Sequence, residues 1–381
     1  MVNNPTDTLK SVRVTMNGQD VTGMLRRLSV TQCMDQPMMT SIVSFTDSKY
    51  QVQQTSAGQP LTINIIPTIG KPLSVNHIVE KIEQSKVSVS GRYMMGGITG
   101  VPPEYKGAVT KRITKSYEGQ PPEKIVESVL KDIGSSKKLN SGSYNTVPAQ
   151  FLSNRNSAME VIDKAKKYPG KGSNVFFFEN HDGYVFKSID DLVKQPSTAT
   201  LIYDHAAYTD IKRSMGSIDN IFDLDFNNGS FGDTLKAELE QDTLVSPENS
   251  QQKPGDKAPS SGSGIPSRLV SNLSGTEENK YIKSSVEQYD AKRGQDFAKQ
   301  RQSLSKLTAA AKVLVMLRPD IVAGSIITIK SNGASGFTDS NPSLSHDGKW
   351  LVKKVTHVCD FSDGSGAPYG RTMIECVGKI Q

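Results

Sequence analysis

The sequence predicts a mainly β protein in which two antiparallel β-barrels flank an α+β module. Short apolar stretches alternate with turn signals near both ends of the chain, which is typical of consecutive antiparallel strands. Apolar residues at helical spacing occur mainly in the middle of the chain. Hydrophobic residues make up 35% of the 381 positions, and Gly, Ser and Asn are abundant, which indicates many turns. A chain of this length exceeds the size at which one hydrophobic core usually stops growing, so several domains are expected.

The first barrel is expected over residues 1–105. Apolar and polar residues alternate over residues 12–16, and the dipeptide Asn17-Gly18 predicts a tight turn after them. Pro67 is expected to end a later strand, because proline cannot continue a sheet ladder. The remaining strands are predicted at Leu28–Val30, Ile42–Phe45 and Leu61–Ile65, followed by a hairpin over Val75–Val89 that ends at Gly96-Gly97.

The α+β module is expected over residues 106–212. Apolar residues recur at helical spacing over Glu123–Ile133 and again over Ser157–Tyr168, so both segments are predicted to be amphipathic helices. Two aromatic stretches then surround the turn residues His181-Asp182-Gly183. This pattern predicts a β-hairpin over Val175–Phe186.

The second barrel is expected in two parts, residues 213–244 and 312–381. The intervening residues 245–311 hold a polar stretch rich in Pro, Ser, Gly and Lys, which is predicted to be a flexible linker because it offers little apolar surface. A polar helix is expected to follow over residues 287–311. The strands of this barrel are predicted near Ile218–Phe226, Val313–Leu317, Ser325–Ile329, Trp350–Cys359 and Arg371–Val377.

The charge of the chain is only mildly basic. Lys and Arg number 45 and Asp and Glu number 39, for a formal charge of +6, and the basic residues form only short clusters such as Lys164–Lys167. Sequence-specific nucleic-acid binding proteins gather their charge on one face so that several phosphates are neutralised together. The charge pattern therefore argues against that class.

The N-terminal residues and the cysteines indicate synthesis in a reducing compartment. Met1 is followed by a polar stretch without the apolar region of a signal peptide, so cytoplasmic synthesis is expected. The three cysteines, Cys33, Cys359 and Cys376, are expected to be reduced thiols. The longest apolar runs fall far short of the ~20 residues of a membrane-spanning helix, so no membrane insertion is expected.

No catalytic, cofactor-binding or metal-binding residue is predicted. His357 and Cys359 stand two apart on a predicted strand and could supply two zinc ligands, but a closed site needs four, so packing on the sheet is the favoured interpretation. Gly170–Ser173 resembles a phosphate loop but follows a helix, which favours a plain loop. Asp190 and Asp191 are expected to cap a helix after Ser188. No cofactor is expected, and the chain is interpreted as a protein without enzymatic activity.

Three stretches of the chain carry distinctive patterns, which are Phe176–Leu192, Val313–Ile327 and Gly348–His357. The first has an aromatic strand, a D-G turn and a returning strand, the second has a strand, a polar turn and a second strand, and the third has the pattern G-K-[aromatic]-L-V-x-x-V-x-H. In this order the stretches resemble the central baseplate hub proteins of contractile-tailed bacteriophages, which are related to the hub part of secretion-system spike proteins. The polar insertion at about residues 245–279 has no match in that family.

The resemblance implies two barrels that are similar to each other and to the tail-tube subunit. It implies a homotrimeric ring that adapts a sixfold tail tube to a threefold central spike and encloses the channel for the genome, without sequence-specific DNA binding. The implied partners are tail-tube subunits, the central spike protein and other baseplate proteins. The implied location is the baseplate of the virion tail, after synthesis in the host cytoplasm.

Two other functions remain open at this stage. The chain could be the hub of a secretion or contractile injection system spike, in which case the spike would be a separate protein. It could also be a cell-wall hydrolase with a catalytic dyad assembled across domains, which sequence motifs would not reveal.

Overall fold

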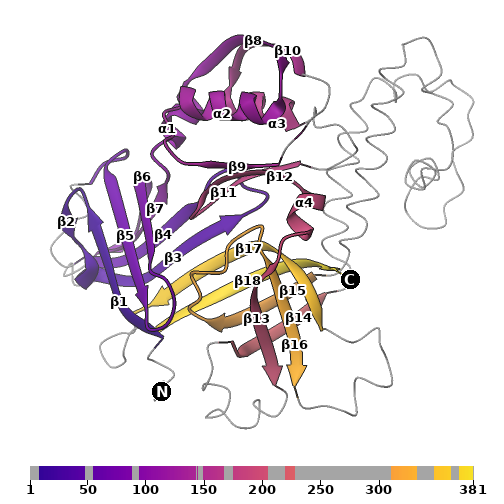
Figure 1. Ribbon diagram of the computed structural model, residues 1–381. Helices are drawn as coiled ribbons and strands as arrows, with labels where there is room; N and C mark the ends of the chain where they lie inside the picture. The colour runs from indigo at the N-terminus through magenta and orange to yellow at the C-terminus, as the bar shows by residue number, and fades with distance from the viewer. Residues whose placement is uncertain are drawn as a thin grey trace, which may run out of the picture.

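The structure, a computed structural model, is described in ten segments of the chain (Figure 1). The expected linker and polar helix over 245–311 lie outside these segments except for residues 310 and 311, which begin a strand. The described residues are 8–47, 55–87, 94–142, 144, 149–166, 175–204, 219–227, 310–332, 347–361 and 369–380.

Most of the described chain is β-structure, which confirms the predicted mainly β fold with a smaller α+β part. The N-terminal strands form what we name the first β unit. Across the sheet, neighbouring strands of this unit are hydrogen-bonded in the order β3-β4-β7-β6-β5-β1-β2. Asn17 and Gly18 have φ angles of 48° and 80°, as the predicted turn after β1 requires. The elements are β1 (Leu9–Met16), β2 (Gln19–Asp20), a 3-10 turn (Thr22–Met24), β3 (Leu25–Cys33), β4 (Thr40–Asp47), β5 (Pro60–Pro67), β6 (Leu73–Val87) and β7 (Met94–Val101).

The C-terminal strands form the second β unit, in the order β14-β15-β18-β17-β16-β13. A parallel bridge between Ile202 and Asn220 brings β13 back to the start of β14, so this unit curls into a closed ring of strands. The backbone N–H of Ile202 donates to the carbonyl oxygen of Asp219 at 2.8 Å. The elements are β13 (Ser197–Asp204), β14 (Ile221–Asn227), β15 (Ala310–Met316), β16 (Ile326–Asn332), β17 (Gly348–Asp360) and β18 (Tyr369–Ile380).

The two β units have the same strand order. The strands of each unit can be numbered 1 to 6 along the chain if the two-residue β2 is left out. In both units the order across the sheet is then 2-3-6-5-4-1. The two units also have register shifts at equivalent places, one in the second strand of each unit and one in the fifth. The first strand differs, because β1 is antiparallel to β5 whereas β13 is parallel to β16. The shifts lie at Leu25/Arg27 in β3 and Ile221/Asp223 in β14, and at Val79/Lys81 in β6 and Val352/Lys354 in β17.

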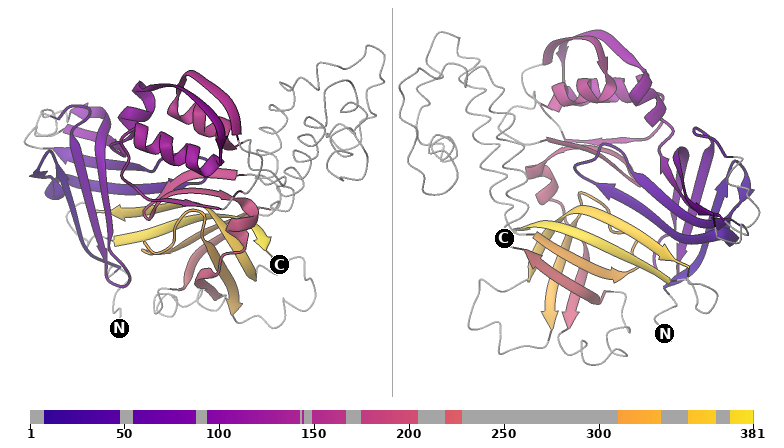
Figure 2. Two further views of the ribbon diagram at one scale, coloured as in Figure 1. Left: turned by 45° about the horizontal axis from the view of Figure 1, so that its top comes forward. Right: turned by 180° about the vertical axis from the view of Figure 1, so that it is seen from behind.

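The α+β module lies over the place where the two units meet (Figures 1 and 2). Its helices begin within one residue of the predicted starts: Pro122 is the first residue of the first amphipathic helix, and Ser157 caps the second by accepting the N–H of Glu160 on its Oγ at 3.3 Å. The predicted hairpin is present as β11 and β12. The elements are α1 (Tyr105–Thr110), β8 (Arg112–Gln120), α2 (Pro122–Asp132), β9 (Leu139–Ser141), β10 (Ala149–Ser157), α3 (Ala158–Lys166), β11 (Val175–Asn180), β12 (Gly183–Ser188) and α4 (Ile189–Val193).

Two local predictions in the first β unit are wrong. The hairpin expected over Val75–Val89 is the single long strand β6, which pairs first with β5 and then continues along β7. Gly96 and Gly97 do not interrupt the sheet but lie inside β7. A Cβ on Gly96 would lie 2.6 Å from the carbonyl oxygen of Glu83 and 2.9 Å from the Phe45 ring, so glycine is required there for close packing rather than for a turn.

One strand pairs across the expected boundaries. β13 lies within residues 106–212, the range expected for the α+β module, yet it pairs with β16 of the second β unit. Its alternate residues Ala199 and Leu201 are buried in the core of that unit. The second unit therefore obtains its first strand, β13, from the chain that precedes β14.

Candidate functional site: the junction of the two β units

β3 and β17 join the two β units edge to edge into one continuous sheet. They pair antiparallel from Cys33 opposite Lys354 to Arg27 opposite Asp360. The hydroxyls of Thr31 and Thr356 are 3.2 Å apart on the outer face. This pairing gives the chain a single sheet of 13 strands rather than two separate ones.

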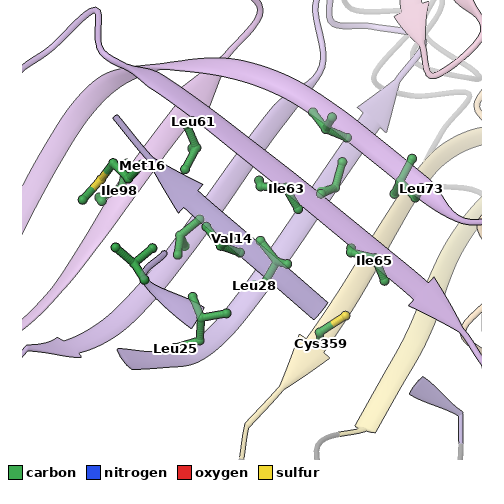
Figure 3. Close-up of a cluster of buried hydrophobic side chains, with 14 of the residues drawn as sticks. Val14, Met16, Leu25, Leu28, Leu61, Ile63, Ile65, Leu73, Ile98 and Cys359 are labelled. Atoms are coloured by element: carbon green, nitrogen blue, oxygen red, sulfur yellow. The ribbon is translucent and has the colours of Figure 1, made fainter. Parts of the chain in front are cut away.

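The hydrophobic core of the first unit extends across this junction. Cys359 of β17 is fully buried and belongs to the same cluster as Leu28 and Ile65 of the first unit (Figure 3). Leu317, which follows β15, is buried in that cluster as well. Because each unit contributes apolar side chains to one shared core, the two units are held together by burial as well as by backbone hydrogen bonds.

The outer face of the continuous sheet carries a row of charges that alternate in sign, beside exposed apolar residues such as Met373. Register places Asp225, Lys312, Glu375 and Lys354 side by side on β14, β15, β18 and β17, with alternating sign. The Lys354 ammonium lies 3.1 Å from a Glu375 carboxylate oxygen. Such opposite-charge neighbours stabilise a sheet modestly and leave little unbalanced charge on its surface.

The same face continues across the first unit with smaller side chains. Ser29 of β3 stands opposite Ile42 of β4, which in turn stands opposite Thr99 of β7. Ile42 is 51% exposed although it is a large apolar residue. No described element of this chain covers this row, so the outer face is open.

The aromatic hairpin β11–β12 places the α+β module on the junction. Its alternate residues face opposite sides: Phe177 and Phe186 pack with helices α2 and α3, whereas Phe178 and Val185 pack with the β units. The second set belongs to a cluster that draws on the module and on both β units. The buried members of this cluster are Met34, Phe178, Val185, Ile189, Leu192, Ala323, Ile326, Leu351 and Val377.

Polar groups at the tip of the hairpin bind the backbone of both units. A carboxylate oxygen of Glu179 accepts the N–H of Met39 at 3.0 Å, from the connection between β3 and β4. The side-chain amide of Asn180 donates to the carbonyl oxygen of Ala323 at 3.4 Å. Gly324 has a φ of 81°, and a Cβ there would lie 2.5 Å from the Phe178 ring, so the loop requires glycine at this point.

Lys137 connects two buried carboxylates beneath the module. Its ammonium lies 2.9 Å from a Glu104 oxygen and also contacts Glu179, whose side chain is fully buried. The Tyr184 hydroxyl donates to Glu104 at 2.9 Å. Burial raises the pKa of Glu179 more than Lys137 lowers it. Burial also acts to raise the pKa of Glu104, but the hydrogen bond and charge of Lys137 outweigh it and lower that pKa.

The residues considered for chemistry from the sequence are dispersed. His357 is fully buried with its Nδ1 3.1 Å from the Thr372 hydroxyl, and Cys359 lies in the apolar core. In the described part of the chain, no group of three or more His, Cys, Asp or Glu residues could hold a metal ion. Asp190 and Asp191, which were expected to cap the helix after Ser188, lie in the first turn of α4, and Ser188 itself caps the helix by accepting the N–H of Asp191. The Gly170–Ser173 stretch lies outside the described residues.

The sequence did not single out two features of this junction. The role of Glu179 depends on the N–H of Met39, which is 140 positions away in the chain. The pairing of β3 with β17 joins residues more than 300 positions apart. No helix in the described segments is both long and apolar enough to cross a membrane.

The two buried histidines predict how stability depends on pH. Burial lowers the pKa of His357 to about 3 and, together with the charge of Lys137, that of His77 to about 3. Unfolding lets each ring bind a proton below its ordinary pKa of 6.5, so the stability that neutral histidines provide is lost as the pH falls from 6.5 towards 3. Well below pH 6.5 each histidine should contribute about 1.4 kcal/mol per pH unit to the slope, and near pH 6.5 about half of that, because the unfolded ring is then only half protonated.

Urea unfolding between pH 7 and 5 measures this slope. The His357→Asn and His77→Asn variants should each reduce it by the contribution of one histidine. An unchanged slope in both variants would show that these rings are not the groups that take up protons on unfolding.

No protein-family model and no curated protein matches the sequence. Solved structures do match. The 43 kDa tail protein of prophage MuSo2 from Shewanella oneidensis has 13% sequence identity and a TM-score of 0.58, over 97% of this chain and 98% of that one. The tail protein from Neisseria meningitidis MC58 has 9% identity and a TM-score of 0.57, over 96% of each chain.

The similarity therefore covers both β units and the module between them. This structural similarity agrees with the resemblance that the sequence motifs indicated. At 9–13% sequence identity, the similarity is one of fold. The chain has the fold of these phage tail proteins.

Proposed function

We propose that this chain is the structural hub of a contractile phage tail baseplate, in which three copies form a ring. The observation that carries the proposal is the presence in one chain of two β units with the same strand order, joined edge to edge. Three chains would then supply six similar units for a sixfold tail tube, while the single α+β module of each chain would repeat three times for a threefold spike.

The open outer face of the sheet supports a role in enclosing the genome channel. On this face Lys354 lies beside Glu375, and Arg371 lies 3.1 Å from Asp360. Tight DNA binding requires several unbalanced cations that release the counterions of the phosphates. A surface with paired charges and hydroxyl groups suits a channel through which DNA passes without being held.

The partners that follow from this role are the tail-tube subunits, the central spike protein and other baseplate proteins. The location that follows is the baseplate of the virion tail, after synthesis in the host cytoplasm. Binding to tube and spike is assigned to opposite ends of the ring, because a ring offers each partner a complete set of equivalent sites.

Light scattering of the purified protein tests the proposal directly. We expect a mass near three times that of the 41.4 kDa chain, and a ring in negative-stain images. A monomer that persists at high concentration and in mixtures with tube and spike proteins would contradict the proposal. Clearing of a cell-wall substrate in a zymogram would instead favour a hydrolase.

A further inference from the structure

The buried cluster around Lys137 contains the groups that an amide bond between two side chains requires. The Lys137 ammonium contacts Oε1 of Glu179, whose side chain is fully buried. A second carboxylate, that of Glu104, lies 2.9 Å from the same nitrogen, and its side chain is only 5% exposed. Lys137 and Glu179 are 42 positions apart in the chain. A covalent bond between them would therefore close a large loop within the α+β module.

We propose that Lys137 and Glu179 condense to an isopeptide bond, with Glu104 as the group that carries the protons. Glu104 first accepts one ammonium proton, which frees the nitrogen lone pair to attack Cδ of Glu179. The bond from Nζ to Cδ forms and the bond from Cδ to Oε1 breaks. Two of the three ammonium protons reach the departing oxygen through Glu104, and that oxygen leaves as water. The positive and negative charges of the pair cancel, so the step needs no other reactant.

The hydrogen bonds at the site favour this step and also fit its product. The Met39 N–H donates to Oε2 of Glu179 at 3.0 Å, where it stabilises the negative charge that develops on this oxygen as the nitrogen attacks. Oε1, the oxygen that contacts Lys137, is the one that leaves. In the amide, the remaining N–H would still face Glu104, and the carbonyl oxygen would still accept from Met39.

The surroundings of the site make the two groups reactive. Burial raises the pKa of Glu179, which favours the uncharged acid, the form that an amine attacks. The Tyr184 hydroxyl donates to Glu104 at 2.9 Å, and the Tyr184 ring stacks on Phe177 with the ring centroids 5.3 Å apart. Lys137 Nζ lies 5.8 Å from the centroid of the Tyr184 ring, so an aromatic wall lies beside the reacting atoms.

Burial and proximity provide the driving force. An ion pair at this place keeps the cost of removing two charges from water, whereas an amide carries no charge. Groups held in contact react as if their concentration were about 10⁵ M or more. The Lys137 side chain keeps 30% of its surface exposed, which gives the released water a way out.

The bond would strengthen the part of the module that docks on the sheet. It would tie the loop between α2 and β9 to β11, the strand whose Phe178 packs against the β units. The reaction itself does not depend on the proposed hub function. In a tail hub, the bond would keep the hairpin attached to its module under mechanical load.

The intact mass of the denatured full-length protein tests the proposal. We expect a mass that is lower than that of the sequence by one water molecule, and a branched tryptic peptide that joins Lys137 to Glu179. Lys137→Arg, which keeps the charge, and Glu104→Gln, which removes the proton carrier, should each have the full mass of their sequence. Lys124→Arg, at the exposed ion pair with Glu127, should still lose one water. A wild-type chain of full mass would overturn the proposal.

Two further outcomes would contradict parts of this assignment. Cyclisation of Asp182-Gly183 to a succinimide would also remove one water, but it would persist in Lys137→Arg and would give no branched peptide. Water loss in Lys137→Arg would therefore overturn the isopeptide bond. Urea unfolding shows whether Glu104→Gln is folded, and water loss in the folded variant would overturn the role of Glu104. The trimer mass from light scattering is a separate measurement, so the proposed ring stands or fails independently.

Discussion

Replacing Lys137 with methionine is expected to lower the free energy of unfolding at pH 7 by about 3 kcal/mol. The Lys137 ammonium lies between the carboxylates of Glu104 and Glu179, and both side chains are almost fully buried. Without the ammonium, two negative charges remain close together on side chains that are almost fully buried. Urea unfolding of the purified variant measures the loss.

Two further variants separate this explanation from a general effect of removing a lysine. Lys124→Met removes a lysine whose 3.0 Å ion pair with Glu127 is exposed, and it should cost no more than about 0.5 kcal/mol. Lys137→Met/Glu179→Gln should recover part of the lost stability, because the amide keeps an acceptor for the Met39 N–H while it removes one charge. The deficit of Lys137→Met should also shrink as the pH falls, since protonation of Glu179 neutralises it. A deficit that does not depend on pH or on Glu179 would refute this account.

Replacing Phe178 with alanine is expected to lower the free energy of unfolding by about 4 kcal/mol. The ring is fully buried in the cluster that joins the α+β module to both β units, and Gly324 packs directly against it. The cavity would remain, because the hairpin is held at its other residues and cannot collapse into the gap. Amide hydrogen exchange should also show that the helices of the module lose protection before the β units do.

Leu152→Ala provides the matched control for this prediction. Leu152 is 64% exposed on β10 of the same module, so its truncation should change stability by less than about 0.5 kcal/mol. Phe178→Leu, which removes less volume, should fall between the two. Equal effects of the three substitutions would show that Phe178 does not hold the module in place.

Local patterns in the sequence were sufficient to predict many of the strands, the two amphipathic helices and the aromatic hairpin. The hairpin is the clearest case, because Asp182-Gly183 and the alternating aromatic residues on either side specify both the turn and the pairing within one short segment. The turn at Asn17 was predictable for the same reason. These features depend on residues that are neighbours in the chain.

The errors and omissions have a different physical origin. Gly96 and Gly97 suggested a break, but the missing side chain of Gly96 makes room for the Glu83 backbone and the Phe45 ring from neighbouring strands, which only the folded sheet reveals. The β3–β17 junction and the contact of Glu179 with Met39 join distant parts of the chain, so periodicity contains no information about them. The candidate site is made almost entirely of such long-range contacts. Its location therefore followed from the fold rather than from a motif.

The connection between the second and third strands differs greatly in length between the two β units. It comprises residues 34–39 in the first and residues 228–309 in the second, although both connect equivalent strand ends. In the proposed ring of three copies, residues 228–309 would belong to every other unit, and Met39 would receive the hairpin in the units between. A binding partner would thus meet two kinds of site in strict alternation. A partner with three identical arms could distinguish them and would settle in one rotational setting instead of two.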